Sequence, residues 1–157
     1  MTTPTMDSLV TEIESKLDPK PLVIDGFLEF TFPSLLPGDT DVVVRTLVPR
    51  QVREVSRDLR HYAEGKACPG GDIAPGDKPG PQEALAYQAV RELAEHVVRV
   101  GARQLQKDGV DTRVEFFDCM ADHLVGIIYR NLQAFLVAVN RILQPGFPSK
   151  TADAVKK

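Results

Sequence analysis

The sequence predicts an α+β protein in which a small β hairpin with an amphipathic helix is followed by an antiparallel pair of long helices. Three observations predict this class. Apolar and polar residues alternate over 28–32, and a β-branched run follows at 41–47, as in two neighbouring strands. A segment rich in glycine and proline, 65–80, separates these strands from the long helices. Apolar residues recur at helical spacing over 49–64, 81–107 and 112–143.

Composition and charge exclude several classes of function. A chain of 157 residues with 43% hydrophobic content is long enough for one domain with a core. The net charge of −3 argues against binding driven by bulk attraction to nucleic acid or anionic lipid. Residues 1–7 lack the features of a signal peptide, and polar residues interrupt the apolar stretch 124–139, so we expect a cytoplasmically made protein that spans no membrane. Cys68 and Cys119 are too few for a disulfide framework, and their thiol state stays open.

The N-terminal part, 1–64, is expected to contain a short helix, the hairpin and the amphipathic helix. Residues 7–17 predict the short helix, with Asp7 as its N-cap, because their apolar residues are spaced by three and four. The two strands are joined by the turn-rich residues 33–39. An isolated pair of strands is marginally stable in water, so we expect its aromatic face to be covered by helices or by a neighbouring molecule.

The amphipathic helix 49–64 begins at Pro49, a favoured first helical residue. At about 100° per residue, one stripe is apolar and another, about 160° away, holds four arginines: Arg50, Arg53, Arg57 and Arg60. Three interpretations of this arginine stripe are open. It is a solvated face with local pairs to Glu54 and Asp58, a contact for an acidic protein, or a contact for DNA phosphates.

The C-terminal half is expected to be a helical hairpin at 81–144. Residues 65–80, with five glycines and three prolines, predict a flexible loop in front of it. The first helix of the hairpin is predicted at 81–107, and the short connection that follows favours an antiparallel partner. The last residues, 145–157, predict a disordered tail.

The second helix of the hairpin is predicted from Thr112, which can form a capping box with Glu115, to Leu143. Such a helix is about 48 Å long, whereas a compact chain of this size has a diameter of about 40 Å. We therefore expect it to break near Gly126 or to project into neighbouring molecules. Its apolar seam has spacings of four and three: Phe117, Ala121, Leu124, Ile128, Asn131, Phe135, Ala138 and Ile142.

The middle of this seam predicts a partner-binding surface formed by Leu124, Ile128, Asn131 and Phe135. Charged replacements of Leu124 and Ile128 are expected to abolish association. Two interpretations of the polar Asn131 are open. It fixes the register between copies of the chain, or its amide is bonded to a backbone group inside a monomer.

No residue pattern predicts catalysis, a metal site or a cofactor. Cys119 and His123 lie one helical turn apart, but no C-x-x-C motif accompanies them and further ligands would come from distant segments. Asp118 and Asp122 have no nucleophile with a recognisable motif beside them. Residues 71–78 lack the lysine spacing and the hydroxyl of a phosphate-binding loop. We therefore expect a protein that is not an enzyme.

Residues 28–59 contain short motifs in a definite order: Phe32-Pro33-Ser34, Pro37-Gly38, and a strand that ends in Arg45-Thr46-Leu47 ahead of the amphipathic helix. In this order the segment resembles small tail proteins of long-tailed bacteriophages. The resemblance is greatest to baseplate hub subunits and assembly factors of contractile-tailed phages, and looser to tail assembly chaperones. Leu35 and Leu36 stand where that pattern has a glycine and an aromatic residue.

The resemblance implies a non-enzymatic structural or assembly protein of a phage tail or baseplate, with no cofactor. Its partners would be other tail or baseplate proteins and copies of itself, in the virion or in the host cytoplasm during assembly. Nucleic acid and membranes are not expected as partners. A competing interpretation is a cytosolic regulatory or DNA-associated domain that uses the arginine-rich helix 49–64, and a third is a small helical enzyme with a scattered site.

Overall fold

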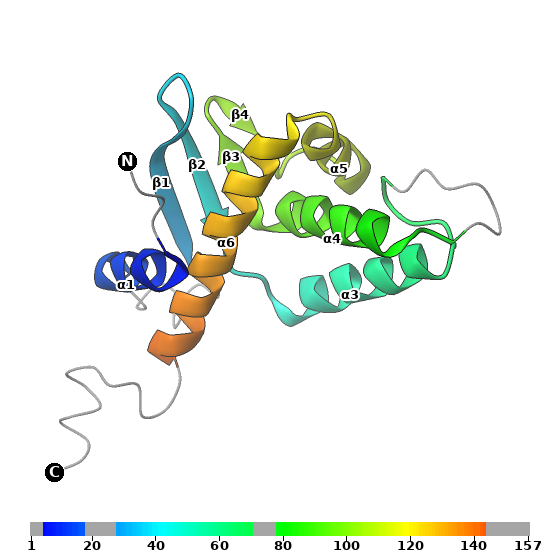
Figure 1. Cartoon of the computed structure of the whole chain (residues 1–157), viewed down its shortest axis with the longest axis horizontal. Coiled ribbons are helices and arrows are strands. Elements are labelled where there is room, and N and C mark those ends of the chain that lie inside the picture. The colour runs from blue at the N-terminus through cyan, green and yellow to red at the C-terminus, as the bar shows by residue number, and fades with distance from the viewer. Residues whose placement is uncertain (1–4, 18–27, 71–77, 144–157) are drawn as a thin grey trace, which may run out of the picture.

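The computed structural model of the chain describes residues 5–17, 28–70 and 78–143. The fold is α+β, as predicted, with a sheet on one side and a group of helices on the other (Figure 1). The predicted tail, 145–157, lies outside the described residues. The elements, in chain order, are α1 (Met6–Lys16), β1 (Glu29–Leu36), β2 (Thr40–Arg45), α3 (Pro49–Ala63), α4 (Pro81–His96), β3 (Val97–Val100), β4 (Arg103–Gln104), α5 (Val110–Asp118) and α6 (Asp122–Leu143).

The short helix α1 is confirmed, but its cap is not the predicted one. Thr5 is the N-cap, and its hydroxyl accepts a hydrogen bond from the Ser8 N–H at 3.1 Å. Asp7 instead lies in the first turn, where its negative charge interacts favourably with the helix dipole. Val10 and Ile13 are buried, so the predicted apolar face of α1 packs into the core.

The predicted hairpin of β1 and β2 is confirmed. The strands are antiparallel, with Phe30 opposite Val44 and Phe32 opposite Val42. The register shifts between Phe32 and Leu36, where Ser34 has a φ of 51° and its N–H donates to Asp41 Oδ1 at 2.8 Å. β1 therefore continues past its predicted end and bends at Ser34.

The prediction of one helix over 81–107 is wrong after His96. In the described part of the chain, the sheet has the strand order β1-β2-β3-β4, and β3 pairs antiparallel with β2. Val97 and Val100 are both buried, as a helical stripe also required. A β-branched run suits a strand, and Gly101, with a φ of 57°, allows the tight turn into β4.

The prediction of one helix from Thr112 to Leu143 is also wrong. Thr112 lies inside α5, whose N-cap is Gly109, so the predicted capping box does not form. The chain leaves the helix at Cys119 and starts again at Asp122, whereas Gly126 lies inside α6 without a break. Because of this break, the apolar residues of α5 and α6 pack into one core and do not form a single projecting helix.

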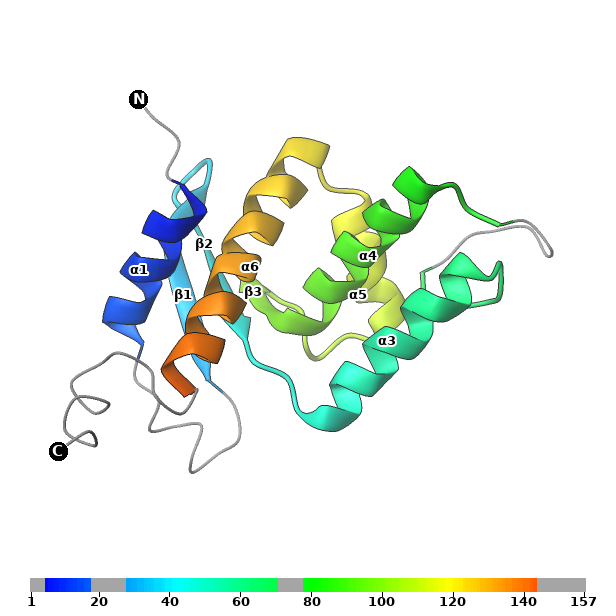
Figure 2. The ribbon, with the colours of Figure 1, turned by 60° about the horizontal axis from the view of Figure 1, so that its bottom comes forward.

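The core lies between the inner face of the sheet and α6. Val42, Val44 and Val97 are fully buried on that face, and α6 contacts β1, α1 and α4 (Figure 2). The Phe135 ring of α6 lies 6.0 Å from the ring of Phe30. Burial of each such side chain contributes about 1.5–3 kcal/mol. The aromatic face of the hairpin is therefore covered within one copy of the chain.

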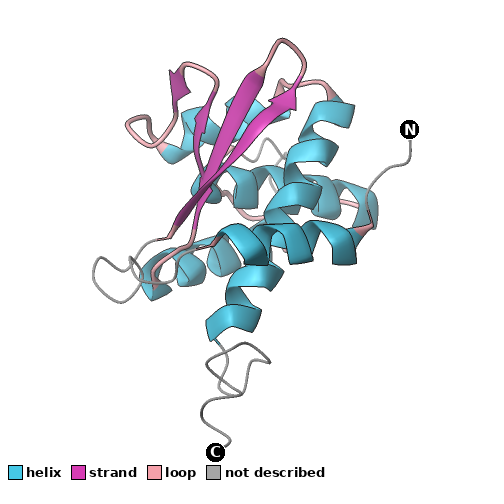
Figure 3. Cartoon of the chain, turned by 90° about the vertical axis from the view of Figure 1, so that its left-hand side faces the viewer, coloured by secondary structure: helices cyan, strands magenta, loops and turns pink. Residues whose placement is uncertain are grey.

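The opposite face of the sheet is more polar. Figure 3 shows the strands on one side of the molecule, with helices beside them. Glu29 and Thr31 of β1 are exposed there, whereas their partners in β2 are the half-buried Arg45 and the buried Val43. An antiparallel sheet with one packed and one solvated face needs no neighbouring molecule to be stable.

Candidate functional site

The arginine-bearing helix α3 forms an antiparallel pair with α4. Three contacts fix the direction of the two helices, because residue numbers rise along α3 as they fall along α4. They are Gln51 with Glu95, Asp58 with Arg91, and Tyr62 with Tyr87. The antiparallel helix pair is therefore formed by α3 and α4, which flank the glycine- and proline-rich segment in the sequence. The sequence predicts this pair between 81–107 and 112–143 instead.

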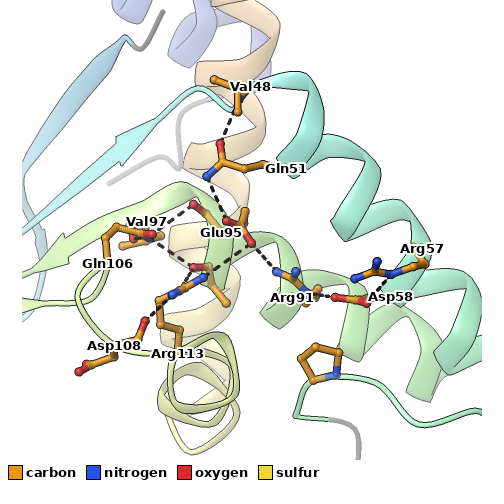
Figure 4. A network of polar contacts seen from close by, with 12 residues as sticks. Val48, Gln51, Arg57, Asp58, Arg91, Glu95, Val97, Gln106, Asp108 and Arg113 are labelled. Carbon is orange, nitrogen blue, oxygen red and sulfur yellow. Dashed lines mark hydrogen bonds and ion pairs between the residues drawn. The ribbon is translucent and has the colours of Figure 1, made fainter.

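A buried ion pair holds α3 in this orientation (Figure 4). Arg91 Nε donates to Asp58 Oδ2 at 2.9 Å, and Arg91 Nη1 donates to Glu95 Oε1 at 2.9 Å. Burial opposes the charge on Arg91, but the hydrogen bonds to Glu95 and Asp58 outweigh this effect and raise the pKa of the guanidinium. The charged pair stays formed at any pH at which the two carboxylates are ionised.

Glu95 connects this pair to the sheet and to α5. Its carboxylate lies 3.9 Å from Arg45 of β2 and 3.7 Å from Arg113 of α5, and it accepts from Gln51 at 3.2 Å. Burial lowers the pKa of both Arg45 and Arg113. Both guanidinium groups nevertheless stay protonated, because arginine is not deprotonated in proteins. We call Asp58, Arg91, Glu95, Arg45 and Arg113 the Glu95 network. Its carboxylates are occupied by arginines under α3, so they offer no exposed acid or base.

The described start of the segment that links α3 to α4 is packed against α4 and α5. The Tyr87 hydroxyl donates to the Pro69 carbonyl, and burial raises the pKa of Tyr87, which keeps the hydroxyl a donor. The Gly70 N–H donates to Asp111 Oδ1 at 2.8 Å. Gly70 has a φ of 68°, and a Cβ there would lie 2.3 Å from Val114 Cγ1, so only glycine fits.

The face of α3 that points away from α4 carries the four predicted arginines. All four are exposed: Arg50, Arg53, Arg57 and Arg60. Within the described residues, only Arg57 has an acidic side chain within 4 Å, at 3.5 Å from Asp58 Oδ1. Asp58 itself is taken up by Arg91, so the expected local neutralisation is weak. We call these four residues the arginine face.

The arginine face lines a shallow hollow of about 510 Å³ that also reaches Val52, Glu54 and Ser56. Val52 is 51% exposed and provides an apolar contact at the edge of the charged surface. α3 occupies the outer edge of the helical group, with α4 on its inner side (Figure 2). The structure therefore brings together the polar residues that the sequence predicts and presents them to solvent.

The predicted seam residues do not form a second surface. Ile128 and Phe135 are completely buried, Asn131 is buried with them, and Leu124 is half-buried. Asn131 Nδ2 donates to the Ile127 carbonyl one turn earlier at 2.8 Å, which is the monomer interpretation of this amide. The reason is that α1 and β1 cover α6 within the same chain.

The apolar surplus that the sequence suggests is also not found among the described residues. Their exposed large hydrophobic side chains lie on three different helices: Val52, Leu85, Ile127 and Val137. Single exposed hydrophobic residues are normal on monomeric proteins. The case for a binding surface therefore depends on the arginine face.

The other chemical candidates stay dispersed. Cys119 and His123 are exposed, and Cys68 is half-buried beside α4. In the residues that the structure describes, no group of three or more histidine, cysteine or acidic side chains could hold a metal ion. Among the described helices, none is both long enough and apolar enough to cross a membrane.

Comparisons with protein-family models, with curated proteins and with solved structures gave no match.

Sequence reasoning missed the Glu95 network. Arg91 and Glu95 are four residues apart on a helix, which usually indicates a solvent-exposed pair. At about 100° per residue, both residues also lie more than about 100° around the helix from the middle of the predicted apolar stripe that contains Val90 and Leu93, which again predicts an exposed pair. Their burial depends on partners from α3, β2 and α5 that are distant in the sequence.

Proposed function

We propose that this chain is a non-enzymatic binding protein that contacts an acidic protein through the arginine face of α3. The observation that carries the proposal is the set of four exposed arginines on one side of a helix that a buried ion pair holds in place. Arginine side chains bind carboxylates in a bidentate geometry and are enriched among the residues that dominate protein interfaces. A rigid helix that presents them loses little entropy on binding.

An acidic protein fits this surface better than DNA does. The chain carries a net charge of −3, which repels a polyanion as a whole. The hollow between the arginines includes the exposed Val52, which suits the mixture of carboxylates and apolar side chains on a protein. The described residues of this face include no aromatic side chain on which a base could stack.

The sequence resemblance narrows the partner. The resembling segment, 28–59, corresponds to β1, β2 and the first two thirds of α3, which includes Arg50, Arg53 and Arg57. We therefore propose that the partners are other tail or baseplate proteins of a bacteriophage. The protein would act in the virion or in the host cytoplasm during assembly.

The double variant R50E/R53E tests the proposed surface. Both positions are exposed in the first turns of α3, where glutamate favours the helix dipole, so the fold should be unaffected. The control is K107E/R141E, which makes the same change in charge at two exposed positions outside α3, one in the turn before α5 and one in α6. The probe is a synthetic helical peptide with glutamates spaced by three and four, titrated at low and at high salt.

We expect the wild type and the control to bind the glutamate peptide, more weakly as the salt concentration rises, and R50E/R53E to lose binding. Equal binding by R50E/R53E overturns the proposal. Tighter binding of duplex DNA than of the peptide by the wild type also overturns it, in favour of a DNA-associated domain.

The phage assignment has its own test. Genes for tail tube, tape measure or hub proteins are expected beside the gene for this chain, and co-expression with their products should give a complex that R50E/R53E does not form. A neighbourhood without tail genes contradicts the phage assignment, while the peptide titration still decides whether the arginine face binds acidic proteins.

A further inference from the structure

The chain contains an acidic helical face whose charges match the arginine face. From residue 109 to residue 122 it has four acidic residues and a single basic one, Arg113. Arg113 is buried and lies 3.7 Å from Glu95, so its charge is used inside the molecule. The acidic residues are all exposed: Asp111, Glu115 and Asp118 of α5, with Asp122 at the start of α6.

The three acidic residues of α5 lie on one side of the helix. At about 100° per residue, Asp111, Glu115 and Asp118 fall within an arc of about 60°. Val114 and Phe117 are buried on another side, toward the core. Asp111 accepts from the Gly70 N–H, and no side chain of the described residues forms an ion pair with Glu115 or Asp118. We call Asp111, Glu115 and Asp118 the acidic face.

The two faces have compatible dimensions. Acidic residues are spaced by four and three along α5, and arginines by three, four and three along α3. At about 1.5 Å per residue, the acidic face extends over about 10 Å and the arginine face over about 15 Å. Two helices with this spacing can place opposite charges side by side along their contact.

The two faces do not neutralise each other within one copy. α4 packs against both α3 and α5, and each of these two helices turns its charged face away from α4. Among the described residues, no ion pair joins an arginine of the arginine face to an acid of the acidic face. Each copy therefore presents a positive and a negative helix face at the same time, although its net charge is only −3.

We propose that the arginine face of one copy binds the acidic face of a second copy of this chain. This inference rests on the proposed function, because it identifies one acidic partner of the same arginine face. The contact is heterologous, since it joins two different surfaces, and it leaves one unused face of each kind at the ends of a pair. Association then continues beyond two copies unless the copies close into a ring.

A charge-swap experiment tests the contact. Variant R50E/R53E takes the arginine face from four positive charges to no net charge, with glutamates at two of its four positions. Variant E115K/D118K makes the acidic face positive, with lysines placed near the C-terminus of α5 where the helix dipole favours them. The control D7K/E29K reverses two exposed acids, one in α1 and one in β1, and these elements lie at the end of the molecule opposite α3 (Figure 1). The mass-average size of each full-length protein is measured by sedimentation equilibrium over a range of concentrations.

The wild type and D7K/E29K are expected to associate, and each of the two face variants alone to lose association by about tenfold or more, because like charges then meet. An equimolar mixture of the two face variants should associate again, since the unaltered acidic face of R50E/R53E meets the unaltered arginine face of E115K/D118K. The variant that carries all four substitutions should also associate by itself. Loss in both single-face variants without rescue in the mixture overturns the proposal.

The outcome also separates this inference from the proposed function. If the wild type stays monomeric but binds the glutamate peptide through Arg50 and Arg53, the acidic partner is a different protein and only this inference is overturned. If neither association nor peptide binding depends on these arginines, the proposed function is overturned as well.

Discussion

Asp58 of α3 and Arg91 of α4 form an ion pair of 2.9 Å in which each side chain is only 3% exposed. This pair decides which side of α3 faces the protein and which side faces solvent. Arg91 also donates to Glu95, and Glu95 lies within ion-pair distance of Arg45 in the sheet and Arg113 in α5. Through these contacts α3 is connected to α4, to the sheet and to α5. The arginine face is exposed because the buried acid of the same helix is already paired.

Breaking this pair should destabilise the fold strongly. Asp58→Ala leaves Arg91 buried with one of its two acidic partners missing, and we expect a loss of about 3–5 kcal/mol in the free energy of unfolding. Arg57→Ala, at the exposed neighbouring position, should cost about 1 kcal/mol or less. Urea unfolding of the two variants measures the difference, and equal effects would show that the pair is not what holds α3.

Stability should depend on pH through His96. The side chain is buried, and Nδ1 lies 2.9 Å from the Arg45 carbonyl oxygen. Burial lowers its pKa from 6.5, against the raising effects of this carbonyl, Glu92 and Glu95. Between the lowered pKa and 6.5 the unfolded chain binds more protons than the folded one, so the free energy of unfolding falls as the pH drops through this window.

His96→Asn removes the titrating group and keeps a donor for the Arg45 carbonyl. Urea unfolding at a series of pH values should then show a shallower pH dependence below 6.5 in the variant than in the wild type. The same slope in both proteins would assign the pH dependence to other groups.

Residues of the α6 seam should behave as core residues. Phe135→Ala removes a completely buried ring beside Phe30, and we expect a loss of about 3–5 kcal/mol in the free energy of unfolding. Val137→Ala, two residues away and 39% exposed, should cost about 1 kcal/mol or less. A folded Phe135→Ala variant with unchanged stability and weaker association would instead restore the seam as a partner surface.

Two glycines should respond to alanine in opposite directions. Gly70→Ala places a Cβ against Val114 at a positive φ and should destabilise the protein. At Gly126, inside α6, no atom lies within 4 Å of an added Cβ, so Gly126→Ala should stabilise by about 1 kcal/mol through helix propensity. Thermal unfolding compares the two, and a stabilising Gly70→Ala would contradict the packing of this turn.

Local patterns predicted the elements whose signals lie within a few residues. The β1–β2 hairpin follows from alternation and from the β-branched run, and α3 follows from its first proline and its divided faces. The arginine face could be predicted for the same reason, since residues three and four apart share a helix face.

The rest depends on partners that are far apart in the sequence. The spacing of Val97 and Val100 is compatible both with the apolar stripe of a helix and with a buried strand. The segment forms a strand because it pairs with β2, which is more than 50 residues earlier in the sequence. The break at Cys119 has neither proline nor glycine, and it is set by the packing of Phe117 and Ile128 into one core. The burial of Arg91 and Glu95 likewise requires Asp58 and Arg113 from other elements.

We propose, above all, that the arginine face binds acidic protein surfaces by charge. The most direct measurement is a four-way titration by fluorescence anisotropy, in which wild type and R50E/R53E each meet the glutamate peptide and its lysine counterpart. We expect the wild type to bind only the glutamate peptide, and R50E/R53E to lose that binding by about tenfold or more. Equal affinity of both proteins for the glutamate peptide would contradict the claim.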